Sequence, residues 1–193
     1  MADSSLAHEM QPLESMARLS GHNELLAEAH HWMAEATEAA KCRPCGCLHS
    51  TLTTLEAAAQ DLPLEAQPLR DELALARARL RSVEYECLGC PTCYPALAAN
   101  AFAAAFPERA AATAACPTDS PEERAGWPPL PGEYRVLRYR APVAICTLTE
   151  EELAARLADA QLTGVALVGR LHTESLGIER AIKNTVANPN IGF

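Results

Sequence analysis

Apolar residues recur at helical spacing through most of the first hundred positions. Apolar side chains three or four positions apart predict amphipathic helices, and such stripes occupy residues 5–20, about 24–41, 48–59, 64–81 and 95–106. The first two stripes are separated at Ser20-Gly21-His22-Asn23, a sequence typical of a helix break and a cap. Residues 1–106 are therefore expected to form an all-helical bundle.

The pattern changes after Phe106. Residues 107–132 are rich in proline and alanine and lose their periodicity, which predicts a linker. Beyond the linker, short apolar runs alternate with amphipathic stretches. They predict strands at 133–139, 142–148 and 162–169, and helices at about 149–160 and 175–187. Ile191 would begin another strand, so residues 133–193 are expected to form an incomplete parallel α/β sheet.

Six of the eight cysteines lie in two short runs, Cys42-Arg-Pro-Cys45-Gly-Cys47 and Cys87-Leu-Gly-Cys90-Pro-Thr-Cys93. The helical hairpin between the runs would return both to one end of the bundle. Two thiolates separated by two residues can hold one metal centre from a single turn. Cys42, Cys45, Cys47, Cys87, Cys90 and Cys93 are therefore predicted metal ligands. Cys116, alone before a proline, is expected to be a plain thiol, with a role as a seventh ligand as the weaker alternative.

Several occupants fit these thiols. An iron–sulfur cluster such as [4Fe–4S] suits soft thiolate ligands, and the second run continues as C-x2-C-x2-C-x-P, which partly matches a ferredoxin loop. Zinc fits two C-x2-C pairs equally well, and copper(I) or mercury is a third interpretation. Disulfides fit least. The cluster is preferred because a single zinc site has no use for six thiolates.

Composition narrows the class of protein. The net charge of −9 argues against nucleic acid as the main partner, and no run of about twenty apolar residues predicts a membrane span. The N-terminus lacks the basic and apolar regions of a secretory signal, so a cytoplasmic location is expected. In that reducing compartment, clustered cysteines hold metal or do redox work more often than they form disulfides.

The C-terminal third resembles the A subunit of tetrahydromethanopterin S-methyltransferase. The resemblance spans about residues 126–193, and order and spacing match as well as the residues. The motifs that carry it are Gly126-Trp127-Pro128, Pro131-Gly132-Glu133-Tyr134, Val143-Ala144, Val165-Ala166-Leu167-Val168-Gly169, His172-Thr173-Glu174-Ser175-Leu176-Gly177-Ile178-Glu179-Arg180 and Asn188-Pro189-Asn190-Ile191.

That resemblance implies a Rossmann-like domain with a corrinoid (cobalamin) that carries a methyl group between a pterin and a thiol. It places the cofactor-binding residues at His172, Thr173, Glu174, Ser175 and Gly177. The loop they form follows a buried strand, where open α/β sheets bind ligands. In the family, the histidine that approaches cobalt lies downstream of the strand that Ile191 would start, so His172 is not taken as the cobalt ligand.

The resulting expectation is an iron–sulfur-binding, corrinoid-associated protein of redox or methyl-transfer chemistry, within a corrinoid-dependent methyltransferase if it is part of an enzyme. Its partners would be a corrinoid or pterin, or a protein that carries one. A second copy or a partner strand would complete the sheet. The alternatives are a zinc-stabilised, non-enzymatic interaction module and a soft-metal binder. The fold expected is a cysteine-rich helical bundle (1–106), a linker (107–132) and an incomplete Rossmann-like α/β segment (133–193).

Overall fold

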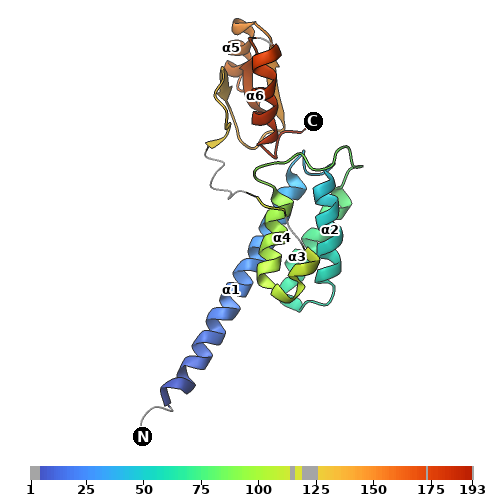
Figure 1. Ribbon diagram of the computed structural model, residues 1–193, viewed down its shortest axis with the longest axis vertical. Coiled ribbons are helices and arrows are strands. Elements are labelled where there is room, and N and C mark those ends of the chain that lie inside the picture. The colour runs from blue at the N-terminus through green and yellow to red at the C-terminus, as the bar shows by residue number, and fades with distance from the viewer. Residues whose placement is uncertain (1–4, 114–115, 119–125, 173, 193) are drawn as a thin grey trace.

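The computed structural model describes residues 5–113, 116–118, 126–172 and 174–192 (Figure 1). Four helices form the first half of the chain: α1 (Ser5–Glu38), α2 (Gly46–Ala59), α3 (Gln67–Arg79) and α4 (Tyr94–Ala105). They are accompanied by the 3-10 helices η1 (Leu64–Ala66) and η2 (Pro107–Thr113). The second half contains β1 (Tyr134–Val136), β2 (Val143–Thr147), α5 (Glu151–Asp159), β3 (Val165–Arg170) and α6 (Glu174–Val186). The protein is therefore mixed α/β, as its sequence predicts.

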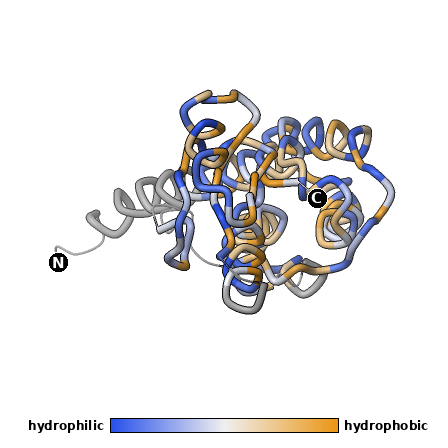
Figure 2. Tube along the Cα trace, turned by 90° about the horizontal axis from the view of Figure 1, so that it is seen from above, coloured by the Kyte–Doolittle hydropathy of each residue, from blue (hydrophilic) through white to orange (hydrophobic). Residues whose placement is uncertain are grey.

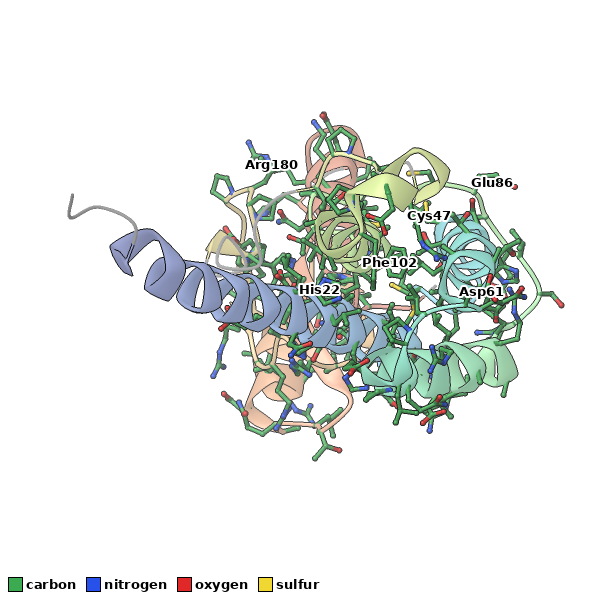
Figure 3. All side chains as sticks on the ribbon, turned by 90° about the horizontal axis from the view of Figure 1, so that it is seen from below. His22, Cys47, Asp61, Glu86, Phe102 and Arg180 are labelled. Atoms are coloured by element: carbon green, nitrogen blue, oxygen red, sulfur yellow. The ribbon has the colours of Figure 1, made fainter. Side chains whose placement is uncertain are left out.

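One apolar core joins the helices of the first half. α2 and α3 each contribute side chains from a single face, whereas α4 is buried around most of its surface. Figure 2 shows hydrophobic and hydrophilic positions alternating along the helical turns. Phe102 is fully buried and lies among these helices in Figure 3. Small residues let the helices approach closely, which suits a chain with 5% aromatic residues. The largest buried members of this core are Leu26, Trp32, Met33, Leu48, Leu52, Leu55, Leu62, Leu69, Leu73, Tyr94, Phe102 and Phe106.

The predicted break at residues 20–23 is wrong, because α1 continues through it. Gly21 costs a helix only about 1 kcal/mol relative to alanine. His22, expected at the cap, instead contacts the end of α4. Its Nδ1 lies 3.1 Å from the Ala105 carbonyl oxygen, and its ring meets Phe106 edge-on at 4.8 Å. These contacts hold the helix together across a sequence that would otherwise end it.

The sheet is mixed rather than parallel. Its order is β1-β3-β2, with β2 parallel to β3 and β1 antiparallel to β3. A parallel crossover needs a dozen or more residues. The connection through α5 between β2 and β3 is long enough, whereas residues 137–142 between β1 and β2 are too few. β1 consequently pairs on the far side of β3, leaving β2 at an edge.

Ile191 does not begin a strand. It is buried in a small core with Ala141, Ala166 and Leu167, after a turn organised by Asn188. The Asn188 side chain donates to the Tyr139 carbonyl at 2.9 Å and accepts from the Asn190 backbone N–H at 2.9 Å. Burial of this apolar side chain against the existing sheet stabilises the turn without a further strand.

Parts of residues 107–132 pack against the two halves. Arg109, in η2, donates to the Ala58 carbonyl at the end of α2. At the other side of the segment, Trp127 donates through its indole N–H to the Asn184 carbonyl of α6 at 2.6 Å. The proline-rich segment predicted as a linker is therefore in contact with α2 near its start, through Arg109, and with α6 near its end, through Trp127. Within the part of the chain that the structure describes, no helix is long and apolar enough to cross a membrane.

Candidate functional site

The first cysteine run forms a turn between α1 and α2. Backbone hydrogen bonds from Cys42 N–H to the Ala39 carbonyl (3.1 Å) and from Cys45 N–H to the Cys42 carbonyl (3.0 Å) close it. Cys45 is the N-cap residue of α2, and both Cys42 and Cys45 are buried. The end of one helix and the start of the next therefore fix two thiols on the inside of the turn.

The second run lies between α3 and α4, beside the first. Backbone hydrogen bonds join the two segments: Arg81 N–H to the Arg43 carbonyl, Glu84 N–H to the Pro44 carbonyl and Gly46 N–H to the Tyr85 carbonyl, at 3.3, 3.0 and 2.9 Å. Cys93 is the N-cap residue of α4. The helical hairpin thus brings both cysteine runs to one end of the helical part, as the sequence suggests.

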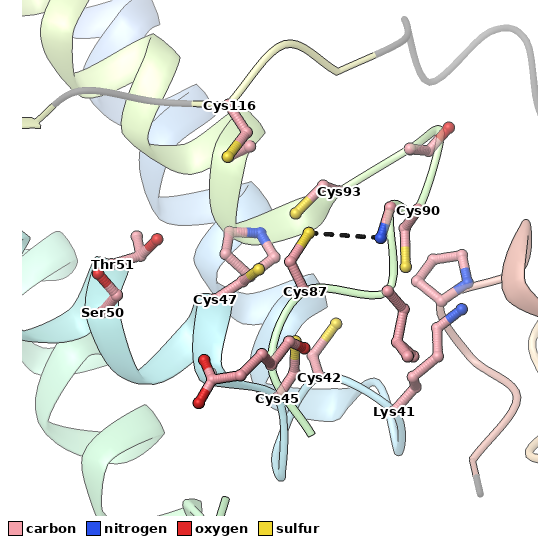
Figure 4. Close-up of a pocket in the computed structure, with 18 of the residues that line it drawn as sticks. Lys41, Cys42, Cys45, Cys47, Ser50, Thr51, Cys87, Cys90, Cys93 and Cys116 are labelled. Carbon is pink, nitrogen blue, oxygen red and sulfur yellow. Dashed lines mark hydrogen bonds between the residues drawn. The ribbon is translucent and has the colours of Figure 1, made fainter. Parts of the chain in front are cut away.

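A positive backbone φ shapes the second run. Gly89 has φ of +65°, a conformation that glycine adopts without steric cost, and its N–H points to the Cys87 sulfur at 3.3 Å (Figure 4). Cys93 N–H donates to the Thr118 hydroxyl oxygen at 2.8 Å, and this hydroxyl donates to the Pro91 carbonyl at 3.1 Å. Through these two hydrogen bonds, Thr118 holds residues 116–118, which follow η2, against the second cysteine run.

All six predicted ligands line one cavity of about 290 Å³, drawn in Figure 4. Cys116 lines it too, because Thr118 holds its segment there, so this thiol belongs to the same pocket as the six. The seven sulfur-bearing residues are Cys42, Cys45, Cys47, Cys87, Cys90, Cys93 and Cys116. Within the described chain, no three histidine, cysteine, aspartate or glutamate side chains are arranged so that they could hold a metal ion. The pocket gathers the thiols without placing them in a finished coordination shell.

Burial controls the protonation of these thiols. It raises the pKa of Cys42, Cys47 and Cys90, and it raises that of Cys93 to about 11. Lys41 counteracts this effect, since its ammonium and its hydrogen bond lower the pKa of Cys90. These four thiols are consequently neutral near pH 7, and a metal must displace their protons on binding.

We expect the metal-free protein to lose stability as the pH rises above about 9. A thiol whose pKa is higher in the folded chain than its ordinary 9.0 stabilises the fold below that value, and the contribution disappears as the pH rises through the folded pKa, about 11 for Cys93. Urea unfolding with chelator and reductant should show a loss of at least about 2 kcal/mol from about pH 8 to about pH 11. Cys93→Ala should reduce this loss, and a stability that stays level or rises would contradict the thiol burial.

A second cavity, of about 350 Å³, lies at the carboxyl end of β3 against α6; we call it the α6 groove. Glu133 sits at its edge between two basic groups, ion-paired with Arg170 and 2.8 Å from Nε2 of His172. These two hydrogen bonds lower the pKa of Glu133. Residues lining the groove include Glu133, Cys146, Arg170, His172, Gly177 and Arg180.

Of the residues predicted to bind a cofactor, some line the α6 groove and others lie beside it. His172 lines it, with 58% of its side chain exposed. Gly177 lines it as well, on the first turns of α6. Glu174 and Ser175 are the first residues of that helix, while Thr173 lies outside the described residues. The loop therefore follows a buried strand and precedes a helix, as predicted.

Gly177 also has a packing role. A Cβ there would lie 2.3 Å from Cδ2 and 3.3 Å from Cβ of Leu171, so only glycine lets α6 approach this loop without a shift. We expect Gly177→Ala to destabilise the protein by about 1–3 kcal/mol through overpacking, despite the helix propensity of alanine. Gly164→Ala, where a Cβ meets nothing within 4 Å, is the matched control and should change the free energy of unfolding by less than about 0.5 kcal/mol. Equal effects in thermal denaturation would contradict the close approach.

Three residues of these sites could not be found from cysteine and loop motifs. Lys41 is only 2% exposed, and its ammonium lies against the thiols. Lys41 directly precedes Cys42, and this position could have indicated a role at the thiols. A lysine near a helix end is normally exposed to solvent, however, so its burial was not expected. Cys116 reaches the pocket through a contact of Thr118 that no spacing reveals. Glu133 meets His172 only because β1 pairs with β3.

Comparison with known proteins concerns the C-terminal part of the chain. Residues 120–193 match the family of the A subunit of tetrahydromethanopterin S-methyltransferase, which confirms the resemblance noted in the sequence. The protein of this name from Methanococcus maripaludis is 43% identical over 75 residues, which make up 39% of this chain and 30% of that protein. The protein from Methanocaldococcus jannaschii is 42% identical over 72 residues, covering 37% of this chain and 29% of that protein.

A second form of this A subunit, from Methanothermobacter thermautotrophicus, is 41% identical over 68 residues, or 35% of this chain and 34% of that protein. The chain therefore spans about a third of the length of the curated relatives it matches. No solved structure matches it. The cysteine pocket lies before the matched residues, so apart from Pro189 its lining comes from outside the resemblance.

Proposed function

We propose that the protein is an iron–sulfur-binding component of corrinoid-associated redox or methyl-transfer chemistry. The observation that carries the proposal is the meeting of seven cysteines in one cavity. Cys42, Cys45, Cys47, Cys87, Cys90 and Cys93 are the proposed ligands. In the reducing cytoplasm, the location proposed for this chain, such thiols remain free to bind metal.

The size of the pocket favours a cluster over a single ion. Its volume of about 290 Å³ is many times the roughly 10–15 Å³ that holds a single water molecule. One zinc ion takes four ligands and would leave three of the seven thiols unused. An iron–sulfur cluster is larger and is held by soft thiolates, so both the space and the number of sulfurs suit it better. When bound, the cluster would supply one-electron chemistry.

The arrangement of the thiols indicates that they must close on the cluster. Cys45 and Cys93 are fixed at helix N-termini, whereas Cys87 is exposed on the second run. Only side-chain and short-loop movements are needed, because the two runs already share three backbone hydrogen bonds. Deprotonation would accompany closure, so affinity should increase with pH while the thiols titrate.

We propose that residues 133–193 form a Rossmann-like α/β segment and a separate unit from the cysteine-rich bundle of residues 1–106. The parallel pair β2 and β3 with α5 between them supports this assignment, as does a groove at the carboxyl end of β3. β2 is an edge strand, which a second copy or a partner strand could extend.

The described residues of the α6 groove do not fit a whole corrinoid. Its volume of about 350 Å³ lies near the lower limit for drug-sized ligands, and a corrinoid with its nucleotide tail is much larger. His172, the one imidazole lining the groove, is engaged with Glu133. We therefore propose that any corrinoid or pterin is carried by a partner, and that the groove recognises part of that partner or its ligand.

Reconstitution tests this function directly. The full chain, prepared without oxygen, is incubated with iron and sulfide and in parallel with zinc, and the metal and sulfide bound per chain are measured. We expect iron and sulfide in comparable amounts, and a signal in electron paramagnetic resonance after reduction. Stoichiometric zinc that iron cannot displace would identify a structural clamp instead, and binding of copper(I) alone would identify a soft-metal binder.

A further inference from the structure

Lys41 connects the cysteine pocket with the second half of the chain. This lysine is 2% exposed, and its ammonium donates to the Val186 carbonyl at the end of α6 at 2.5 Å. The same ammonium is hydrogen-bonded to Cys90 and lies close to Cys42 and Cys45. Figure 4 shows its side chain entering the pocket beside Cys90. A buried lysine is rare unless it is paired, so this position needs a partner of opposite charge.

The turn after α6 forms part of the same junction. Pro189 lines the cysteine pocket, and a Cβ at Gly192 would approach Ala40 to 3.2 Å. A second link between the halves is the ion pair of Arg140 with Glu35, at 2.7 Å. The same helix lines the α6 groove from Gly177 to Thr185, directly before Val186. The Lys41 contact is therefore made at the end of a helix that forms a wall of the second cavity.

We propose that Lys41 is a positioning residue that compensates negative charge on the proposed metal–thiolate centre and couples this centre to the end of α6. The inference rests on the proposed function. A thiolate-bound centre would be anionic, and one-electron reduction of it by an external electron donor would add a further negative charge. The fixed ammonium would therefore stabilise the reduced state more than the oxidised state. Through the Val186 carbonyl, the same group orders the turn at residues 186–192.

Charge and hydrogen bonding can be separated by substitution in the full chain. Lys41→Met removes both, Lys41→Arg keeps the charge, and Lys41→Gln removes the charge while leaving an amide donor in the pocket. Arg81→Met is the matched control, since it removes a surface charge paired only with Glu84 in the described ion pairs. Iron per chain is measured first, then the midpoint potential, then amide hydrogen exchange in residues 186–192.

We expect Lys41→Met to lower the midpoint potential and to speed exchange in the turn at least tenfold. Lys41→Gln should lower the potential with a smaller change in exchange, while Lys41→Arg and Arg81→Met should keep the potential of the parent chain. If Lys41→Met fails to fold, the midpoint potential of Lys41→Gln tests the inference: a lower potential supports it, and an unchanged potential overturns it. A loaded variant whose potential and exchange both equal those of the parent would overturn the inference. A parent chain without iron would overturn the proposed function, and exchange alone would then test the link to α6.

Discussion

We expect Cys90→Ser to abolish the metal binding proposed for the cysteine pocket, and Cys42→Ser to do the same. Cys42 is buried at the base of the first run, and Cys90 is held beside Lys41 in the second. Each variant replaces a soft thiolate by a hydroxyl that is a poor ligand for iron or zinc. Loss of groups that merely orient ligands costs about 10–100-fold in metal affinity, so loss of a ligand should cost on the order of 100-fold or more.

The control for this experiment is Cys146→Ser. Cys146 lies on β2, at the α6 groove, and does not line the cysteine pocket. Metal per chain after reconstitution and gel filtration should equal that of the parent in Cys146→Ser and fall to background in the other two variants. Full retention of metal by both Cys42→Ser and Cys90→Ser would contradict the assignment of the pocket. Circular dichroism of the metal-free variants distinguishes lost binding from lost folding.

Leu52→Ala should lower the free energy of unfolding of the metal-free protein by about 2–5 kcal/mol. Leu52 is 0% exposed in the core that α1, α2, α3 and α4 share, so its truncation leaves a cavity among them. The matched substitution, Leu64→Ala, removes a side chain that is 80% exposed and should change the free energy by less than about 0.5 kcal/mol. Equal losses in urea unfolding would show that this core does not stabilise the helical part.

This result also bears on the cysteine pocket. Leu52 lies on α2, whose N-terminus carries Cys45 and Cys47. A weaker core would loosen the relative placement of α2 and α4, and hence of the two runs. We therefore expect the metal to restore part of the stability that Leu52→Ala removes, because binding to the folded state alone stabilises it.

Local patterns were sufficient for the helical half. Apolar residues at helical spacing located α2, α3 and α4, and the x2 spacing of the cysteines indicated which thiols would meet. The break predicted at Gly21 failed because tertiary contacts of His22 outweigh a modest propensity cost. Hydrophobic periodicity is a property of one segment, so it cannot reveal contacts with a neighbouring helix, such as those of His22 with the end of α4.

Pairing between distant segments was harder to predict. The spacing and type of residues around β1 do not show that it lies antiparallel to β3, and this pairing is what brings Glu133 to His172. The burial of Lys41 depends on a contact between the two halves, and that of Ile191 depends on packing against Ala141, Ala166 and Leu167, which are distant in sequence. The position of the loop at residues 172–175 could be predicted because a loop between a buried strand and a helix is a general feature of α/β sheets, and its use as a binding site stays a prediction. The size and the ion pairs of the α6 groove required the structure.

The most direct test of the iron–sulfur assignment is the metal content of the full chain purified without oxygen, together with its visible absorption spectrum. We predict iron and inorganic sulfide bound to the chain, and a broad thiolate-to-iron absorption that bleaches on addition of a reductant. A colourless protein with stoichiometric zinc, or one with no metal after reconstitution, would contradict the assignment and leave the cysteine pocket as a structural junction.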